Sequence, residues 1–242
     1  SYRPLGGLEE PARAEAYADE VSRAIEGFAD DGIPFAGMLV CPIFANEGLP
    51  DVSPRFLQLA VERVHGAGGL FVADEVQAGF GRTGRMWGHE WSSIVPDVVT
   101  LGKPMGNGHP LAAVVTRKEL VDAFRSEVFY FNTFGGNPVS CAVGAAVLDV
   151  MEEEKLVQNA ARVGDYLRDG LRRLQGRYPI IGDIRGRGLW IGIELVRNPA
   201  TKEPATEECG RLVNRMREEG ILMGRIGAYD NVLKLRPPMV FA

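Results

Sequence analysis

Residues 70–75 read Leu70-Phe71-Val72-Ala73-Asp74-Glu75, a short apolar run that ends on two acidic residues. Such a run, preceded here by Gly66-Ala67-Gly68-Gly69, is typical of a strand that is buried in a sheet. The acids therefore follow the carboxyl end of a buried strand, which is the edge where ligands bind in open α/β sheets.

Helices and strands are expected to alternate on both sides of this run. A helix over residues 9–30 and a buried strand over 35–41 come before it. A second helix is expected between that strand and Leu70, because Ser53-Pro54 supplies its N-cap and a first-turn proline. Strands over 97–101 and 111–116 come after it. This alternation predicts an α/β fold with a mostly parallel sheet that helices cover on both faces.

The pattern changes near residue 150. Two consecutive helices are expected over 137–154 and 155–175, and Arg185-Gly186-Arg187-Gly188 is expected to form a turn. The elements that follow are a strand over 188–196, a helix over 206–219 and short strands near 221 and over 232–236. We therefore predict two domains, residues 1–150 as part of a ligand-binding large domain and residues 151–242 as a small α+β domain.

Composition narrows the class of protein. A hydrophobic content of 45% is ordinary for a globular chain, and a net charge of -5 argues against a nucleic-acid partner. Three widely spaced cysteines predict reduced thiols in a cytoplasmic protein and not a disulfide framework. We expect no membrane association and no secretion, because neither a bilayer-spanning apolar run nor a signal peptide is apparent.

Lys103 lies just after another predicted strand, in the glycine-rich loop Gly102-Lys103-Pro104-Met105-Gly106. Together with Asp74 it fits the chemistry of pyridoxal 5'-phosphate (PLP), which needs a lysine amine to hold its aldehyde and an acid to keep its pyridine nitrogen protonated. A carboxylate about 4 Å from a pyridinium gains roughly 4 kcal/mol at an effective dielectric constant of 20. Asp74 is also compatible with a turn-capping acid, whereas an ATPase metal site is disfavoured because no G-x-x-x-x-G-K-[ST] occurs.

Longer motifs carry a family resemblance. Residues 74–84 (DEVQAGFGRTG) resemble the D-E-V-Q-x-G-F-G-R-T-G signature of class-III aminotransferases, residues 132–138 (NTFGGNP) their T-F-G-G-N-P segment, and residues 188–198 their G-L-x-x-G-I-E-L stretch. The resemblance runs in register from about Tyr17 to the end. It implies the large domain of a PLP fold-type-I (aspartate-aminotransferase-like) enzyme, incomplete because the family's upstream half is absent, followed by the small C-terminal domain.

The resemblance also implies roles for individual residues. Asp74 would pair with the ring nitrogen, Val76 would pack on one ring face and Gln77 would hydrogen-bond the ring hydroxyl. Lys103 would form the Schiff base and shuttle protons. Thr133 would reach the PLP phosphate of a neighbouring subunit, which implies a homodimer whose active site is shared across the interface.

Two substitutions resemble one branch of the family. In an ungapped alignment Asn46 stands where many members carry a gating glutamate, and Lys234 stands where their carboxylate-binding arginine is expected. Lysine is a less directional anion receptor than arginine, and both changes resemble ethanolamine-phosphate phospho-lyases. A one-residue shift would place Glu47 at the glutamate position, and Lys234 and Arg236 are also compatible with a solvated strand edge.

The expected function is a PLP-dependent phospho-lyase that eliminates phosphate from a small amino-alcohol phosphate such as ethanolamine phosphate. The alternatives are an aminotransferase, which moves an amino group from an amine or amino acid to a keto acid, an amino-group isomerase or epimerase, and a non-catalytic assembly domain if the segment stands alone. No metal site is expected, because the three histidines lack paired ligand spacing. Without the upstream half the sheet would expose an unpaired edge, so we expect this segment alone to bind PLP poorly.

Overall fold

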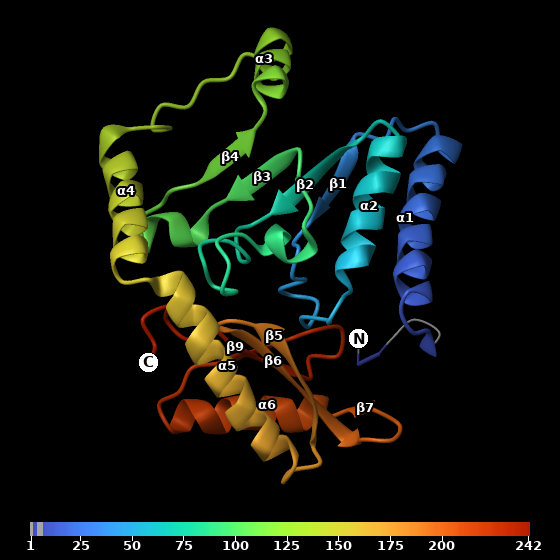
Figure 1. Ribbon diagram of the computed structural model, residues 1–242, viewed down its shortest axis with the longest axis vertical. Helices are drawn as coiled ribbons and strands as arrows, with labels where there is room; N and C mark the ends of the chain where they lie inside the picture. Colours follow the sequence, from blue (N-terminus) through green and yellow to red (C-terminus); the bar gives the residue numbers. More distant parts are fainter. Residues whose placement is uncertain (1, 4–6) are drawn as a thin grey trace.

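The computed structural model describes residues 2–3 and 7–242, whose strands form two sheets with helices packed around them (Figure 1). The strands of the first sheet lie in chain order: β1 (Gly37–Val40), β2 (Leu70–Asp74), β3 (Val98–Leu101) and β4 (Ala113–Thr116). The first three are parallel and β4 is antiparallel to β3. The connection from β3 to β4 contains only a short 3-10 helix, and a parallel crossover needs a dozen residues or more. The predicted, mostly parallel sheet is therefore confirmed.

Two helices pack side by side on this sheet: α1 (Ala12–Asp30) and α2 (Pro54–Gly66) (Figure 1). Ser53 caps α2 as predicted, because its side chain accepts a hydrogen bond from the Arg55 N–H at 3.2 Å. The apolar faces of both helices enclose one core with the sheet, formed by Ala14, Ala18, Phe56, Leu57, Leu59, Ala60, Val64, Phe71 and Ile94.

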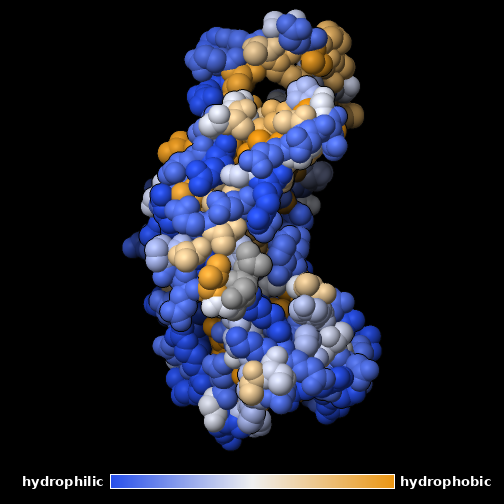
Figure 2. All heavy atoms as spheres, turned by 90° about the vertical axis from the view of Figure 1, so that its right-hand side faces the viewer, coloured by the Kyte–Doolittle hydropathy of each residue, from blue (hydrophilic) through white to orange (hydrophobic). Residues whose placement is uncertain are grey.

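The cover expected on both faces of the sheet is incomplete. The helix α4 (Pro138–Glu153) packs Met151 near Leu101, but Leu39 on the edge strand β1 and Val114 and Val115 on β4 are exposed. The helix α3 (Lys118–Glu127), which the sequence analysis did not predict, buries none of its residues. Hydrophobic side chains consequently gather at the α3 end of the molecule, whereas the face over α1 is mainly hydrophilic (Figure 2).

The second sheet is antiparallel and has the order β5-β6-β9-β8, with β7 paired to β6: β5 (Ile181–Arg187), β6 (Trp190–Asn198), β7 (Glu203–Pro204), β8 (Gly224–Ile226) and β9 (Val232–Leu235). The helices α5 (Leu156–Gln175) and α6 (Thr206–Glu218) pack against it. Their shared core contains Ile184, Ile191, Ile193, Leu195, Ala205, Cys209 and Leu233.

The prediction of a turn at Arg185-Gly186-Arg187-Gly188 is wrong for its first three residues, which end β5. Gly186 pairs with Ile191 of β6, and a methyl group at Gly186 would lie 2.1 Å from the Trp190 carbonyl oxygen. The glycine is therefore needed for the close approach of two strands and not for chain reversal. The short strand predicted near residue 221 begins at Gly224. Within the described residues, no helix is both long and apolar enough to cross a membrane.

Candidate active site

The predicted acid and lysine follow neighbouring strands of the first sheet. Asp74 is the last residue of β2 and lies in register with Thr100 of β3, and its Oδ1 accepts the Val76 N–H at 3.0 Å. Lys103 opens the 3-10 helix η3 (Lys103–Gly106), directly after β3. Because β2 and β3 are parallel, their carboxyl ends place both residues at one edge of the sheet.

Glu75 holds the loop that follows Asp74. Its carboxylate is fully buried and accepts the backbone N–H groups of Gly88 at 2.8 Å and His89 at 2.9 Å, and His89 Nδ1 lies 2.8 Å from the same carboxylate. The Glu75 N–H donates to the Thr100 carbonyl at 3.0 Å. These contacts tie both ends of the 75–89 loop to one side chain, and the loop carries Val76 and Gln77.

A cavity of about 920 Å³ lies at this edge and is lined from both sheets. Val76, Gln77 and Lys103 line it from the loops that follow β2 and β3, and Trp190 of β6 and Arg236, directly after β9, line it from the side of the second sheet. Arg82 adds a further cationic side chain. Among the described residues that line this cavity none is acidic, so it is a cationic environment.

Lys234 of β9 forms a cluster with two other predicted residues, Asn46 and Gln77. Its Nζ donates to Asn46 Oδ1 and to Gln77 Oε1, each at 3.1 Å. The side chain is 8% exposed, and Nζ lies 4.8 Å from the centre of the Trp190 ring. Burial, followed by repulsion from Arg236, lowers the pKa of Lys234. Within the described part of the chain no carboxylate forms an ion pair with this ammonium group.

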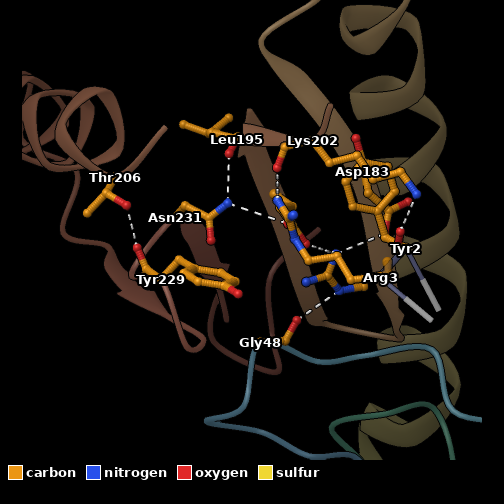
Figure 3. A network of polar contacts seen from close by, with 11 residues as sticks. Tyr2, Arg3, Gly48, Asp183, Leu195, Lys202, Thr206, Tyr229 and Asn231 are labelled. Carbon is orange, nitrogen blue, oxygen red and sulfur yellow. Dashed lines mark hydrogen bonds and ion pairs between the residues drawn. The ribbon is translucent and has the colours of Figure 1, made fainter. Parts of the chain in front are cut away.

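The second sheet positions the loop that carries Asn46. The Asn46 carbonyl accepts the Gly227 N–H at 3.1 Å, and the Gly48 carbonyl accepts Arg185 Nε at 2.8 Å. Arg185 in turn forms an ion pair with the buried Glu194 at 2.7 Å. Gly48 and Asp183, which also contact Arg185, are part of the polar network shown in Figure 3. It is therefore Asn46, and not Glu47, that contacts Lys234 in this structure.

Thr133 lies elsewhere. It belongs to the exposed segment between α3 and α4 and does not line the cavity. In this segment Asn132 Oδ1 accepts the N–H groups of Phe134 and Gly135 at 3.2 and 3.0 Å, while the aromatic rings of Phe129, Phe131 and Phe134 are exposed. Within one chain the structure thus brings together Asn46, Gln77 and Lys234 by hydrogen bonds. Gln77 also lines the cavity with Val76, Lys103 and Arg236, whereas Thr133 belongs to neither group.

Arg82 and Trp190 are cavity residues to which the sequence had assigned no role. Arg82 donates to the Pro237 carbonyl at 2.8 Å, and burial lowers the pKa of its guanidinium group. Both residues fall inside motifs that the sequence displays, the glycine-rich loop at 79–84 and the strand near 190.

Comparison with known proteins decides the family. The family model described as Aminotransferase class-III matches residues 7–242. The chain belongs to the class-III aminotransferase family. Members of this family are PLP-dependent enzymes, and the expected fold-type-I α/β architecture is confirmed by the solved relatives.

Relatives of the class-III family with different named activities match at similar levels. A mitochondrial alanine–glyoxylate aminotransferase 2 homologue of Arabidopsis thaliana is 46% identical over 99% of this chain and 49% of its own length. An ethanolamine-phosphate phospho-lyase homologue of Caenorhabditis elegans is 47% identical over 74% of this chain and 39% of its own. The present chain therefore spans at most about half the length of these relatives.

Solved structures that resemble this chain also include both a phospholyase and an aminotransferase. An Arthrobacter phospholyase in complex with phosphoethanolamine superposes with a TM-score of 0.93 at 43% identity, over 98% of this chain and 57% of that one. A Bacillus anthracis aminotransferase superposes with a TM-score of 0.85 at 35% identity, over 93% of this chain and 52% of that one. Phospholyases and aminotransferases therefore share this fold, and family membership alone does not distinguish the two reactions.

Proposed function

We propose that the intact enzyme is a PLP-dependent phospho-lyase that eliminates phosphate from a small amino-alcohol phosphate such as ethanolamine phosphate. The observation that carries this proposal is the buried ammonium group of Lys234, which two neutral amides hold and which has no carboxylate partner among residues 2–3 and 7–242. A buried charge is costly unless it is paired. An anionic group on the substrate would supply the missing partner. Arg236 and Arg82 line the neighbouring cavity, which Gln77 and Trp190 also line, and would add to the attraction.

The residues at the sheet edge fit PLP by their chemistry. Bound PLP supplies an aldehyde that an amine can hold and a ring that withdraws electrons from the carbon beside the substrate amine. Asp74 is the acid that would hold a proton at the ring nitrogen, and Val76 offers an apolar surface to a ring face. Gln77 uses its oxygen for Lys234, which leaves its amide N–H groups to donate to the ring hydroxyl.

Lys103 would then remove the proton, and Lys234 and Arg236 would bind the leaving phosphate. The Lys103 amine would anchor the cofactor at rest and, once the substrate amine has replaced it, its Nζ would take a proton from the amine-bearing carbon. Lys234 and Arg236 would bind the phosphate oxygens and stabilise the charge that the group carries away. Hydrolysis of the unsaturated amine that remains gives an aldehyde and ammonia.

An aminotransferase is the second candidate, because the Arabidopsis relative and the Bacillus anthracis structure carry that name. The same residues would serve both reactions up to the removal of the proton by Lys103. In the aminotransferase Lys103 would return that proton to the cofactor, whereas in the phospho-lyase the phosphate on the adjacent carbon would leave first.

The test uses the full-length enzyme with PLP and ethanolamine phosphate, without a keto acid, and measures released inorganic phosphate. Sustained multiple turnover that the Lys103→Ala variant lacks is the expected result. Absence of phosphate, together with formation of alanine when pyruvate is added, would replace the lyase by the aminotransferase.

We further propose that the active unit is a homodimer, in which Thr133 of one subunit reaches the PLP phosphate of the other. Its place in an exposed, aromatic-rich segment outside the cavity supports this arrangement. Residues 1–150 and 151–242 are proposed as large and small domains, since the first sheet ends at Thr116 and the second begins at Ile181. A cytoplasmic location stays a prediction.

A further inference from the structure

Trp190 has an unusual position between the two sheets. It opens β6, is 3% exposed and packs against Ala45 and Leu49 of the loop that carries Asn46. It also lines the cavity of the proposed active site. Its indole Nε1 is buried and has no hydrogen-bond partner, so its contribution comes from the ring and not from a hydrogen bond.

The ring of Trp190 is the third neutral neighbour of the Lys234 ammonium group. The amides of Asn46 and Gln77 use two of the three N–H donors, and the ring centre lies 4.8 Å from Nζ. The Arg82 guanidinium lies 5.9 Å from the same ring. An aromatic face attracts a cation through its quadrupole but carries no net charge.

The difference between an uncharged ring and a charged partner affects how well Lys234 can bind an anion. A carboxylate at the position of Trp190 would stabilise Lys234 and also cancel its charge, which would leave little attraction for an anionic ligand. A tryptophan stabilises the buried cation and leaves the full charge, and one N–H donor, for the ligand. The same reasoning applies to Arg82, whose hydrogen bonds within the described chain go to backbone carbonyls.

We infer that Trp190 is a specificity-determining residue, whose ring face holds the Lys234 ammonium group in place as an uncancelled positive charge for the phosphate group of the substrate. The inference rests on the proposed function and names a residue that makes it possible. Trp190 therefore selects for an anionic substituent without touching the reacting carbon.

The experiment uses the full-length, PLP-loaded enzyme and two readouts, the Kd of inorganic phosphate by calorimetry and the KM and kcat for ethanolamine phosphate. Trp190→Leu removes the ring face, whereas Trp190→Phe keeps a ring and loses no hydrogen bond. We expect Leu to raise Kd and KM about 5-fold with kcat changed by less than about 2-fold, and Phe to stay within about 2-fold of the unmodified enzyme.

A matched control is Trp91→Leu, since Trp91 also lies between cations, with Arg85 and Arg187 at 4.1 and 4.4 Å from its ring centre, but outside this cavity. It should leave the phosphate Kd unchanged. In a Lys234→Met background, Trp190→Leu should have no further effect on that Kd, which separates loss of the cation contact from general damage to the fold.

Unchanged phosphate binding in Trp190→Leu, or an equal loss in Trp190→Phe, would overturn the inference. Persistence of the full effect of Trp190→Leu in the Lys234→Met background would overturn it as well. If the unmodified enzyme releases no phosphate from ethanolamine phosphate, the proposed function fails, while the calorimetric Kd values still test Trp190.

Discussion

At the scale of single residues, the cavity depends on how Lys234 is held. Two amide oxygens and a ring surround its ammonium group, and two of these neighbours, Gln77 and Trp190, line the cavity together with Arg236. These contacts stabilise the buried ammonium group but none of them neutralises its charge, so a bound anion would stabilise it further. This arrangement makes the charge at position 234 more important for substrate binding than for folding.

Replacing Lys234 with methionine, which has a similar length but no charge, should weaken binding of the phosphate ester. Charged hydrogen bonds contribute about 2 kcal/mol, so we expect kcat/KM for ethanolamine phosphate to fall roughly 30-fold. Lys234→Arg is the control, because it keeps a charge and should retain most of the activity. Steady-state kinetics of the two variants check this, and equal values for Lys234→Met and the unmodified enzyme would mean that the phosphate binds elsewhere.

The lowered pKa of Lys234 predicts how binding depends on pH. Burial shifts this pKa below its ordinary value of 10.5, so the ammonium form predominates below the lowered value and the neutral amine predominates above it. A phosphate ester is a dianion above about pH 6. KM for the ester should therefore rise with increasing pH already below 10.5, whereas in Lys234→Arg, where the charge persists, it should stay flat. The same alkaline rise in both proteins would assign it to another group.

At the scale of elements, the loop over residues 75–89 shows how a buried acid can support the site from outside it. Glu75 makes no contact with the cavity, but its carboxylate collects two backbone N–H groups and one imidazole nitrogen. The loop is thereby closed on itself, and Val76 and Gln77 are placed beside Lys103.

Removal of the Glu75 carboxylate should therefore destabilise the protein. Glu75→Ala leaves buried donors without a partner, and we expect a loss of about 3 kcal/mol in the free energy of unfolding. Glu75→Gln, which keeps one acceptor oxygen, should lose less. Urea unfolding monitored by tryptophan fluorescence measures both, and a loss under about 1 kcal/mol for alanine would show that the loop is held by other contacts.

Elements with an apolar core-facing pattern could be predicted from the sequence, and those without one could not. The strands at Leu70 and Val98 and the capped helix at Pro54 follow from local patterns. The helix α3 buries no residue, so no core-facing apolar pattern marked it in the sequence. The end of β5 reads as a turn because its glycine serves a close strand approach, which is visible only once β6 is in place.

At the scale of the whole molecule, the site is an assembly of distant segments. The Lys234 contacts reach across 188 residues to Asn46 and 157 residues to Gln77. No local pattern predicts such contacts; the resemblance of the motifs to class-III aminotransferases proposed these three residues as site members. Trp190 and Arg82 were missed because their roles arise only from the packing of the second sheet onto the first.

The exposed segment between α3 and α4 carries the last prediction, which concerns assembly. Phe129 is 93% exposed, and Phe131 and Phe134 lie near it in sequence with their rings also exposed. Apolar surface of this kind gains free energy when it is covered, and a second subunit that receives Thr133 at its PLP phosphate would cover it. Phe131→Asp should therefore shift the full-length enzyme from dimer to monomer in sedimentation and weaken PLP binding, whereas Thr133→Ala should weaken PLP binding and leave the dimer intact. A monomeric unmodified enzyme that retains PLP tightly would contradict both the shared site and the role assigned to Thr133.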